Sequence, residues 1–107
     1  MTRLSRSCRW ATWAWVAAFV VGANVAQAAD PRAGAKLYQQ HCENCHGARG
    51  QGNMPGLPNF TRGEGLLQSN DKLLAVIESG KGIMPAYRGL LSPQEIRNVI
   101  AHLRTLH

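Results

Sequence analysis

The sequence predicts an all-α fold in a single small domain. Three segments carry apolar residues at three- and four-residue spacing, each is bounded by residues typical of helix caps, and no segment shows the alternation of a strand. A length of 107 residues leaves room for one domain and excludes a two-domain enzyme. With 45% apolar and 17% charged residues, the composition also excludes collagen-like, mucin-like and disordered chains.

Residues 1–28 have the pattern of a secretory signal peptide. Three arginines without an acid precede an apolar run from Trp10 to Ala23, and Ala26-Gln27-Ala28 has the small-x-small form of a cleavage site. An uncleaved membrane anchor is the alternative, because Trp10 to Ala29 is about the 20 residues that a bilayer span requires. Polar residues interrupt its end, so we predict cleavage, a periplasmic location, no membrane span after cleavage, and a mature domain of residues 29–107.

The formal net charge of +6 does not indicate nucleic-acid binding. Removal of residues 1–28 takes away three arginines and no acid, so the charge falls to about +3. The remaining Lys and Arg residues are spread singly along the chain, which is typical of a solvated surface. Cys8 also leaves with the signal, and the remaining Cys42 and Cys45 are too close together to join distant segments. A domain this small then needs a metal or cofactor to be stable.

The first predicted helix begins with Asp30 as N-cap and Pro31 at the first helical position, where a missing N–H costs nothing. One apolar stripe follows at helical spacing through Ala33, Leu37, Tyr38, His41 and Cys45. Residues 47–65 hold six glycines and two prolines, and we predict a loop there.

Two further helices are predicted after this loop. One begins after Ser69 and Asn70 and stops at Gly80, and its apolar face carries Leu73, Leu74 and Ile77. Residues 82–85 form another loop. The last helix has the clearest start, a capping box with Ser92 as N-cap and Glu95 at N3. Its apolar face is formed by Ile96, Val99, Ile100, Leu103 and Leu106.

The segment Cys42-Glu43-Asn44-Cys45-His46 carries the chemistry, because C-x-x-C-H is the attachment signature of c-type haem. The spacing brings both sulfurs to one side of a helix, where each can add to a haem vinyl group, and holds His46 beneath the iron as proximal ligand. A thioredoxin-like disulfide pair would need a βαβ setting, and a zinc site would need two more closely spaced Cys or His ligands. The sequence offers neither, so we predict one covalent haem c per chain.

The sixth iron ligand decides between functions, because a thioether suits electron transfer whereas an open site suits peroxidase or gas-binding chemistry. Met54 lies in the loop expected to wrap the proximal side, and His41 precedes Cys42 and cannot readily cross the ring. Met84 follows a helix that can carry the chain to the opposite face, so we predict Met84, with an ordinary core thioether as the alternative. The remaining candidates are His102 and His107.

Five stretches combine into a wider pattern: Gly34-x-x-x-Tyr38, Cys42-x-x-Cys45-His46-Gly47, Gly56-Leu57-Pro58-Asn59-Phe60, Met84-Pro85-Ala86-Tyr87 and Leu91-Ser92-x-x-Glu95-Ile96. With them, essentially all of residues 29–107 resembles the class I c-type cytochromes. The resemblance implies three or more helices wrapped around one covalent haem, with the first and last helices crossing. It also implies His and Met axial ligands, here His46 and Met84, and one-electron carriage.

The resemblance further implies that the carbonyl of Pro58 accepts a hydrogen bond from the His46 imidazole, fixing the ring orientation. It implies a close approach of the last helix at Gly34, usually against an aromatic residue, for which this sequence has His102. We expect His102 to fill that aromatic position against Gly34 and Tyr38, with a pH-sensitive contact or a redox entry point as alternatives. The expected haem-packing residues are Tyr87, Phe60, Ile77, Leu57, Leu73 and Ile83.

The function predicted from these observations is that of a periplasmic electron carrier of a respiratory chain, not an enzyme. It would shuttle single electrons between larger redox proteins such as a dehydrogenase, a reductase or a terminal oxidase, and would bind no nucleic acid. Two alternatives stay open. One is a ligand-binding or weakly peroxidatic haem protein with a labile Met84, and the other is a small haem subunit permanently docked on a dehydrogenase or oxidase.

Overall fold

A computed structural model describes residue 22 and residues 26–107 of the chain. Within these residues the elements are α1 (Pro31–His41), α2 (Glu43–His46), the 3-10 helix η1 (Phe60–Arg62), α3 (Asn70–Ser79) and α4 (Pro93–Leu103). The described part contains two isolated β-bridges and no longer strand, which confirms the predicted all-α class. The predicted signal peptide lies almost wholly outside the described residues and stays a prediction.

The helices begin where the predicted caps stand. The side chain of Asp30 accepts a hydrogen bond from the Arg32 N–H at 2.8 Å, and Ser69 does the same for α3. At α4 the capping box is complete, with Ser92 Oγ accepting from the Glu95 N–H and the Glu95 carboxylate accepting from the Ser92 N–H. Each such cap stabilises its helix by about 1 kcal/mol, so local sequence fixes these three starting points.

The first helix is shorter than the sequence predicts. We expected one helix to carry the stripe through Cys45, but α1 ends at His41, and Cys42, with φ −119°, is the cap residue between α1 and α2. The Cys45 N–H, which would reach the His41 carbonyl in a continuous helix, lies 3.3 Å from the Cys42 carbonyl instead. The predicted loop of residues 47–65 also contains η1, which Asn59 caps. The spacing of apolar residues does not reveal the early end of α1 or the presence of η1, because both are changes in backbone conformation that leave the residue pattern unchanged.

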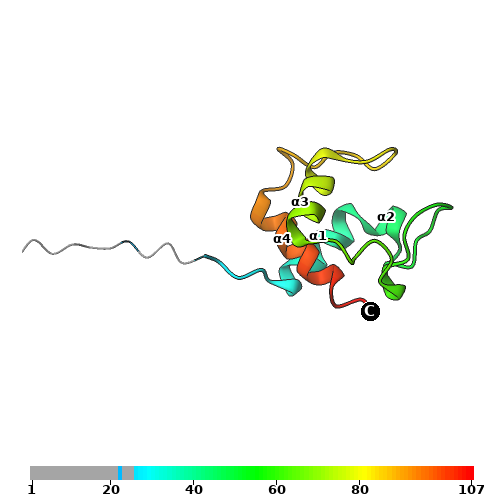
Figure 1. Cartoon of the computed structure of the whole chain (residues 1–107), viewed down its shortest axis with the longest axis horizontal. Helices are drawn as coiled ribbons and strands as arrows, with labels where there is room; N and C mark the ends of the chain where they lie inside the picture. The colour runs from blue at the N-terminus through cyan, green and yellow to red at the C-terminus, as the bar shows by residue number, and fades with distance from the viewer. Residues whose placement is uncertain (1–21, 23–25) are drawn as a thin grey trace, which may run out of the picture.

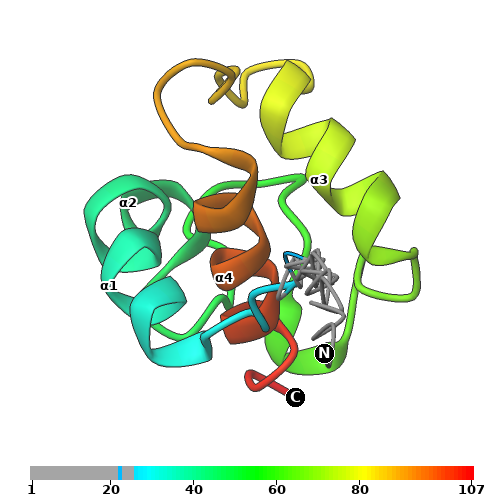
Figure 2. The same cartoon turned by 90° about the vertical axis from the view of Figure 1, so that its left-hand side faces the viewer.

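Helix α4 lies between α1 and α3 (Figure 2), and it crosses α1 at Gly34. A Cβ atom at position 34 would overlap the Asn98 carbonyl oxygen and lie 2.9 Å from the Val99 nitrogen, so this approach requires glycine. The predicted crossing of first and last helices is confirmed. Backbone atoms of α4 meet Gly34, while the His102 ring packs on Tyr38 with the ring centroids 5.2 Å apart.

The hydrophobic core lies around this crossing. Tyr38 of α1 and Ile96 and Ile100 of α4 are almost inaccessible to water, and α3 adds Leu73 and Ile77. Full burial of one such side chain stabilises the fold by about 1.5–3 kcal/mol. Among the described residues, no helix has both the length and the apolar character needed to cross a membrane.

Candidate haem site

A cavity of about 250 Å³ brings the predicted site residues together. One wall is α2 with the glycine-rich loop (residues 47–59), and the other is the segment between α3 and α4, here called the Met84 loop (residues 80–91). Both loops extend to the side of the molecule where α2 lies (Figure 1). The lining residues are His41, Cys42, Asn44, Cys45, His46, Met54, Leu57, Ile83, Met84, Pro85 and Tyr87.

The two cysteines are free thiols, with Cys42 half-buried and Cys45 exposed. Burial, with a smaller contribution from the charge of Cys45, raises the pKa of the Cys42 thiol to about 11. The Cys42 sulfur is therefore uncharged at neutral pH. A thioether is also uncharged, so the same surroundings accept a covalently attached group without a penalty for burying charge.

His46 is the last residue of α2, and its ring stacks on Phe60 with the centroids 5.0 Å apart and the planes 23° apart. Burial lowers the pKa of the His46 imidazole, which favours the neutral form that binds metals. The His46 Nδ1 atom is buried and has no hydrogen-bond partner in the described structure. The predicted hydrogen bond to the Pro58 carbonyl is thus not formed here, and the role of Pro58 stays a prediction.

Short backbone hydrogen bonds hold the glycine-rich loop beside α2. The Gly52 N–H donates to the His46 carbonyl at 2.7 Å, and the Asn53 N–H donates to the Cys45 carbonyl at 2.9 Å. These bonds place Met54 at the edge of the cavity, where 40% of its surface is exposed. The loop therefore lies directly beside the motif, and its predicted place on the proximal side of the haem stays a prediction.

The Met84 loop starts at Gly80, which ends α3 with φ +74°. A Cβ atom at position 80 would lie 2.6 Å from the Met84 carbonyl oxygen, so the turn requires glycine for both its backbone angle and its space. Lys81 and Met84 then exchange two backbone hydrogen bonds of 3.1 and 3.0 Å. Met84 is half-buried against the core, whereas its neighbour Ile83 is 79% exposed.

The structure divides the predicted haem-packing residues into two groups. Tyr87, Leu57 and Ile83 line the cavity. Phe60 lies against the His46 ring instead, and Ile77 and Leu73 belong to the buried core face of α3. Sequence reasoning did not anticipate Asn44 and Pro85 in the lining, although each stands beside a residue that it did select.

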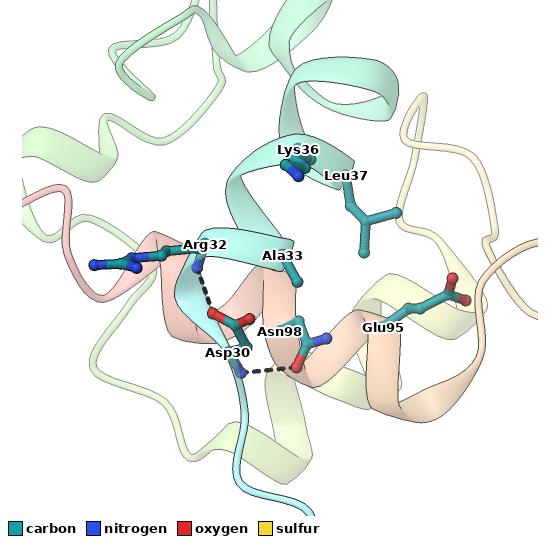
Figure 3. A pocket seen from close by; sticks show the side chains of 7 residues that line it. All are labelled: Asp30, Arg32, Ala33, Lys36, Leu37, Glu95 and Asn98. Carbon is teal, nitrogen blue, oxygen red and sulfur yellow. Dashed lines mark hydrogen bonds between the residues drawn. The ribbon is translucent and has the colours of Figure 1, made fainter.

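A larger hollow of about 460 Å³ lies at the N-terminal end of α1, away from the motif. Figure 3 shows Asp30 there, with its N–H donating to Asn98 Oδ1 at 2.9 Å and its carboxylate accepting from Arg32. Its lining mixes two acids with two bases and contains no residue of the C-x-x-C-H motif. The smaller cavity is therefore the chemically relevant one.

A family described as "Cytochrome C oxidase, cbb3-type, subunit III" matches residues 29–103. The chain belongs to this family of class I c-type cytochromes. Cytochrome c6 of Thermostichus vulcanus is 34% identical over 92 residues, which are 82% of this chain and 80% of that protein. Cytochrome c6 of Leptolyngbya boryana is 35% identical over 80 residues, which are 70% of this chain and 91% of that protein.

A second kind of relative is much longer. The cbb3-type cytochrome c oxidase subunit FixP of Bradyrhizobium sp. (strain ORS 278) is 36% identical over 83 residues, which are 75% of this chain. The chain spans only 29% of the length of that subunit. As a class I c-type cytochrome, the chain carries haem c attached covalently. The paired thiols, the neutral imidazole and the orphaned Nδ1 atom all fit that group.

Proposed function

We propose that this cytochrome is a periplasmic one-electron carrier, not an enzyme, whose haem iron is held by His46 and Met84. The supporting observation is that one cavity is lined by both cysteines, His46 and Met84, although Met84 lies far along the chain. When bound, the haem supplies a site that gains and loses a single electron. The thioether of Met84 favours the reduced iron, raises the potential and excludes small ligands.

Burial favours Met84 over the other candidates that line the cavity. Met84 is half-buried and packs against the core, whereas 40% of the surface of Met54 is exposed. The His41 ring packs edge-on against Tyr87 with the centroids 6.0 Å apart, and it belongs to the same segment as the cysteines. A ligand fixed by the core holds its position through many turnovers, so Met84 suits a carrier best.

Pro58 has a proposed supporting role. It is half-buried, and its carbonyl lies on the glycine-rich loop that hydrogen-bonds to the His46 carbonyl through Gly52. The buried His46 Nδ1 atom has no hydrogen-bond partner, and with the iron on the other ring nitrogen its N–H would donate to the Pro58 carbonyl. That hydrogen bond would fix the ring and raise its basicity.

Partners would dock at the cavity rim, which we define as Met54 and Ile83. These two apolar side chains are exposed to 40% and 79% beside the cavity, and an exposed apolar edge suits short contacts with a redox protein. A mature charge of about +3 against two haem propionates leaves weak long-range attraction. The proposed partners are a dehydrogenase, reductase or terminal oxidase of a respiratory chain, reached after export by residues 1–28.

The similarity to FixP favours a second candidate, a haem subunit permanently docked on an oxidase. The two candidates differ in how the protein elutes on size-exclusion chromatography of a mild detergent extract. A free carrier elutes at the size of a single chain of 11.7 kDa or less, and a docked subunit elutes with a much larger complex.

Replacement of each methionine in the holoprotein tests the ligand assignment. The oxidised wild type should be low-spin, show the weak near-infrared band of a thioether on ferric haem, and bind carbon monoxide poorly when reduced. Met84→Ala should abolish the band, lower the potential and admit carbon monoxide. Met54→Ala is the matched control and should keep the band. Loss of the band in Met54→Ala alone would transfer the assignment to Met54, and a wild type that binds carbon monoxide readily would exclude the carrier.

A further inference from the structure

Two tyrosine hydroxyls bond to the backbone on either side of the C-x-x-C-H motif. Tyr38 donates to the carbonyl of Gly47, which directly follows the motif, at 2.6 Å. Tyr87 donates to the carbonyl of His41, which directly precedes it, at 2.7 Å. Tyr38 comes from α1 itself, but Tyr87 comes from the Met84 loop. The second bond therefore joins the Met84 loop to the end of α1, directly before the first cysteine.

The acceptor of this second bond exists because α1 ends before the motif. In a continuous helix the His41 carbonyl would accept from the Cys45 N–H, but that N–H bonds to the Cys42 carbonyl instead. A carbonyl at a helix end seeks another donor, and the Tyr87 hydroxyl supplies it. The break between α1 and α2 thus provides the acceptor to which the Met84 loop is hydrogen-bonded.

The other bonds of the Met84 loop lead elsewhere. The Tyr87 N–H donates to the Ile77 carbonyl at 3.0 Å and the Arg88 N–H to the Glu78 carbonyl at 3.1 Å, so the backbone is fixed to α3. Among the hydrogen bonds of the described residues, the one from the Tyr87 hydroxyl alone joins this loop to residues 38–47. Tyr87 is buried and lies three positions after Met84 on the same cavity wall.

We infer that Tyr87 is a positioning residue for the sixth ligand: its hydroxyl holds the Met84 loop against the cysteine-bearing segment and so limits how often Met84 leaves the iron. This inference rests on the proposed ligation by Met84. The two tyrosines then have separate roles. Tyr87 controls the Met84 side of the haem, whereas Tyr38 fixes the backbone that follows His46.

The test compares two variants of the holoprotein that each lose one phenol-to-carbonyl hydrogen bond of nearly equal length. Tyr87→Phe keeps the ring contact with His41, and Tyr38→Phe keeps the ring contact with His102. Added imidazole is the probe, because it binds ferric haem only when Met84 has left. We expect Tyr87→Phe to bind imidazole about three- to tenfold more tightly than wild type, the effect of one lost hydrogen bond, and Tyr38→Phe to stay within about twofold of wild type.

Chemical unfolding of both variants distinguishes a specific effect on the position of Met84 from a general loss of stability. Equal gains in imidazole affinity that follow equal losses of stability would overturn the inference, as would a Tyr87→Phe variant that binds like wild type. Tyr87→Leu, which also removes the ring, should bind imidazole at least as tightly as Tyr87→Phe. A wild type without the near-infrared thioether band would overturn the proposed ligation itself. A wild type with the band and an inert Tyr87→Phe would overturn only the role of Tyr87.

Discussion

The crossing of α1 and α4 and the cavity side of the molecule are built in opposite ways. At the crossing, Tyr38, Ile96 and Ile100 are almost inaccessible, and the helices meet backbone to backbone at Gly34. On the cavity side, Cys45 is exposed and Ile83 reaches 79% exposure. The crossing is complete with the residues of the chain alone. The cavity side has apolar walls that protein atoms do not cover, as expected where a haem forms the rest of the core.

The stabilising interactions differ in the same way. The crossing depends on apolar burial, in which many small contributions combine and no single one decides. The cavity walls depend on individual hydrogen bonds from loops, such as the Gly52 N–H to the His46 carbonyl and the Tyr87 hydroxyl to the His41 carbonyl. A cavity wall held by a few loop hydrogen bonds opens at low energetic cost unless a bound ligand joins it to the opposite wall. The covalent bonds and axial ligands of the haem would supply that bridge.

The largest effect should follow from removing the attachment on the cavity side. The double variant Cys42→Ala/Cys45→Ala should hold no covalent haem and lose its stable fold, because a domain this small buries too little surface alone. Acid–acetone extraction and far-ultraviolet circular dichroism measure the two losses. Cys8→Ala is the control and should keep the haem. A double variant that retains its haem through extraction, or that unfolds as the wild type does, would contradict this prediction.

The next largest effect should come from the crossing. Gly34→Ala should lose about 3 kcal/mol or more of unfolding free energy, because the new Cβ forces the helices apart at the Asn98 backbone. Helix propensity alone predicts the opposite sign, a gain of about 1 kcal/mol. Gly89→Ala, at φ +82° but in open space, should cost only about 1–2 kcal/mol. Guanidinium unfolding of the holoproteins ranks the two, and the reverse order would show that α1 and α4 can separate easily.

The elements that local sequence determines were predictable. Asp30, Ser69 and Ser92 cap the three long helices as their side-chain chemistry requires, and Gly80 ends α3. The early end of α1 was not predictable, because the apolar spacing continues across it. Gly34 was marked by resemblance, but only the structure shows that the backbone of Asn98, rather than His102, fills the space above it.

For the candidate site, too, the sequence predicted some residues, and only the structure showed the contacts of others. The motif predicted Cys42, Cys45 and His46 from spacing alone, and Met84 lines the same cavity. The haem-packing roles of Phe60 and Ile77 stay predictions, since apolar type predicts burial but not which surface buries it: Phe60 stacks on His46, and Ile77 belongs to the buried core. The hydrogen bond of Tyr87 to His41 was also beyond sequence reasoning, because it depends on a carbonyl that the helix break leaves without its usual donor.

A smaller effect is expected at Arg104, which links the crossing to the segment before α3. Its guanidinium donates to the carbonyls of Leu66 and Gln68 and to Asn70 Oδ1. Arg104→Lys keeps the charge but lacks the planar set of donors, so the holoprotein should lose about 1–2 kcal/mol of unfolding free energy. Thermal unfolding measures the loss. Arg97→Lys, on the exposed face of α4, is the control and should leave stability unchanged. Equal effects at both positions would mean that the hydrogen bonds of the Arg104 guanidinium do not stabilise the fold.

The smallest effect concerns His102 at the crossing, and it depends on pH. Burial against α1 lowers the pKa of His102 below its usual 6.5, while the neighbouring Tyr38, whose pKa is raised to about 12 by burial, stays neutral. The unfolded chain then binds more protons than the folded one between the lowered pKa and 6.5, so wild-type stability is full above 6.5 and falls as the pH drops through this window.

The variant His102→Phe keeps a ring against Tyr38 and has no charge to bury. Between pH 8 and pH 5, the wild type should therefore lose more unfolding free energy than His102→Phe, by less than about 1 kcal/mol because solvent reaches part of the ring. The other histidines are common to both proteins and cancel in the difference. Parallel pH profiles would show that the crossing accepts a charged imidazole, and that it is less completely closed than its buried apolar residues indicate.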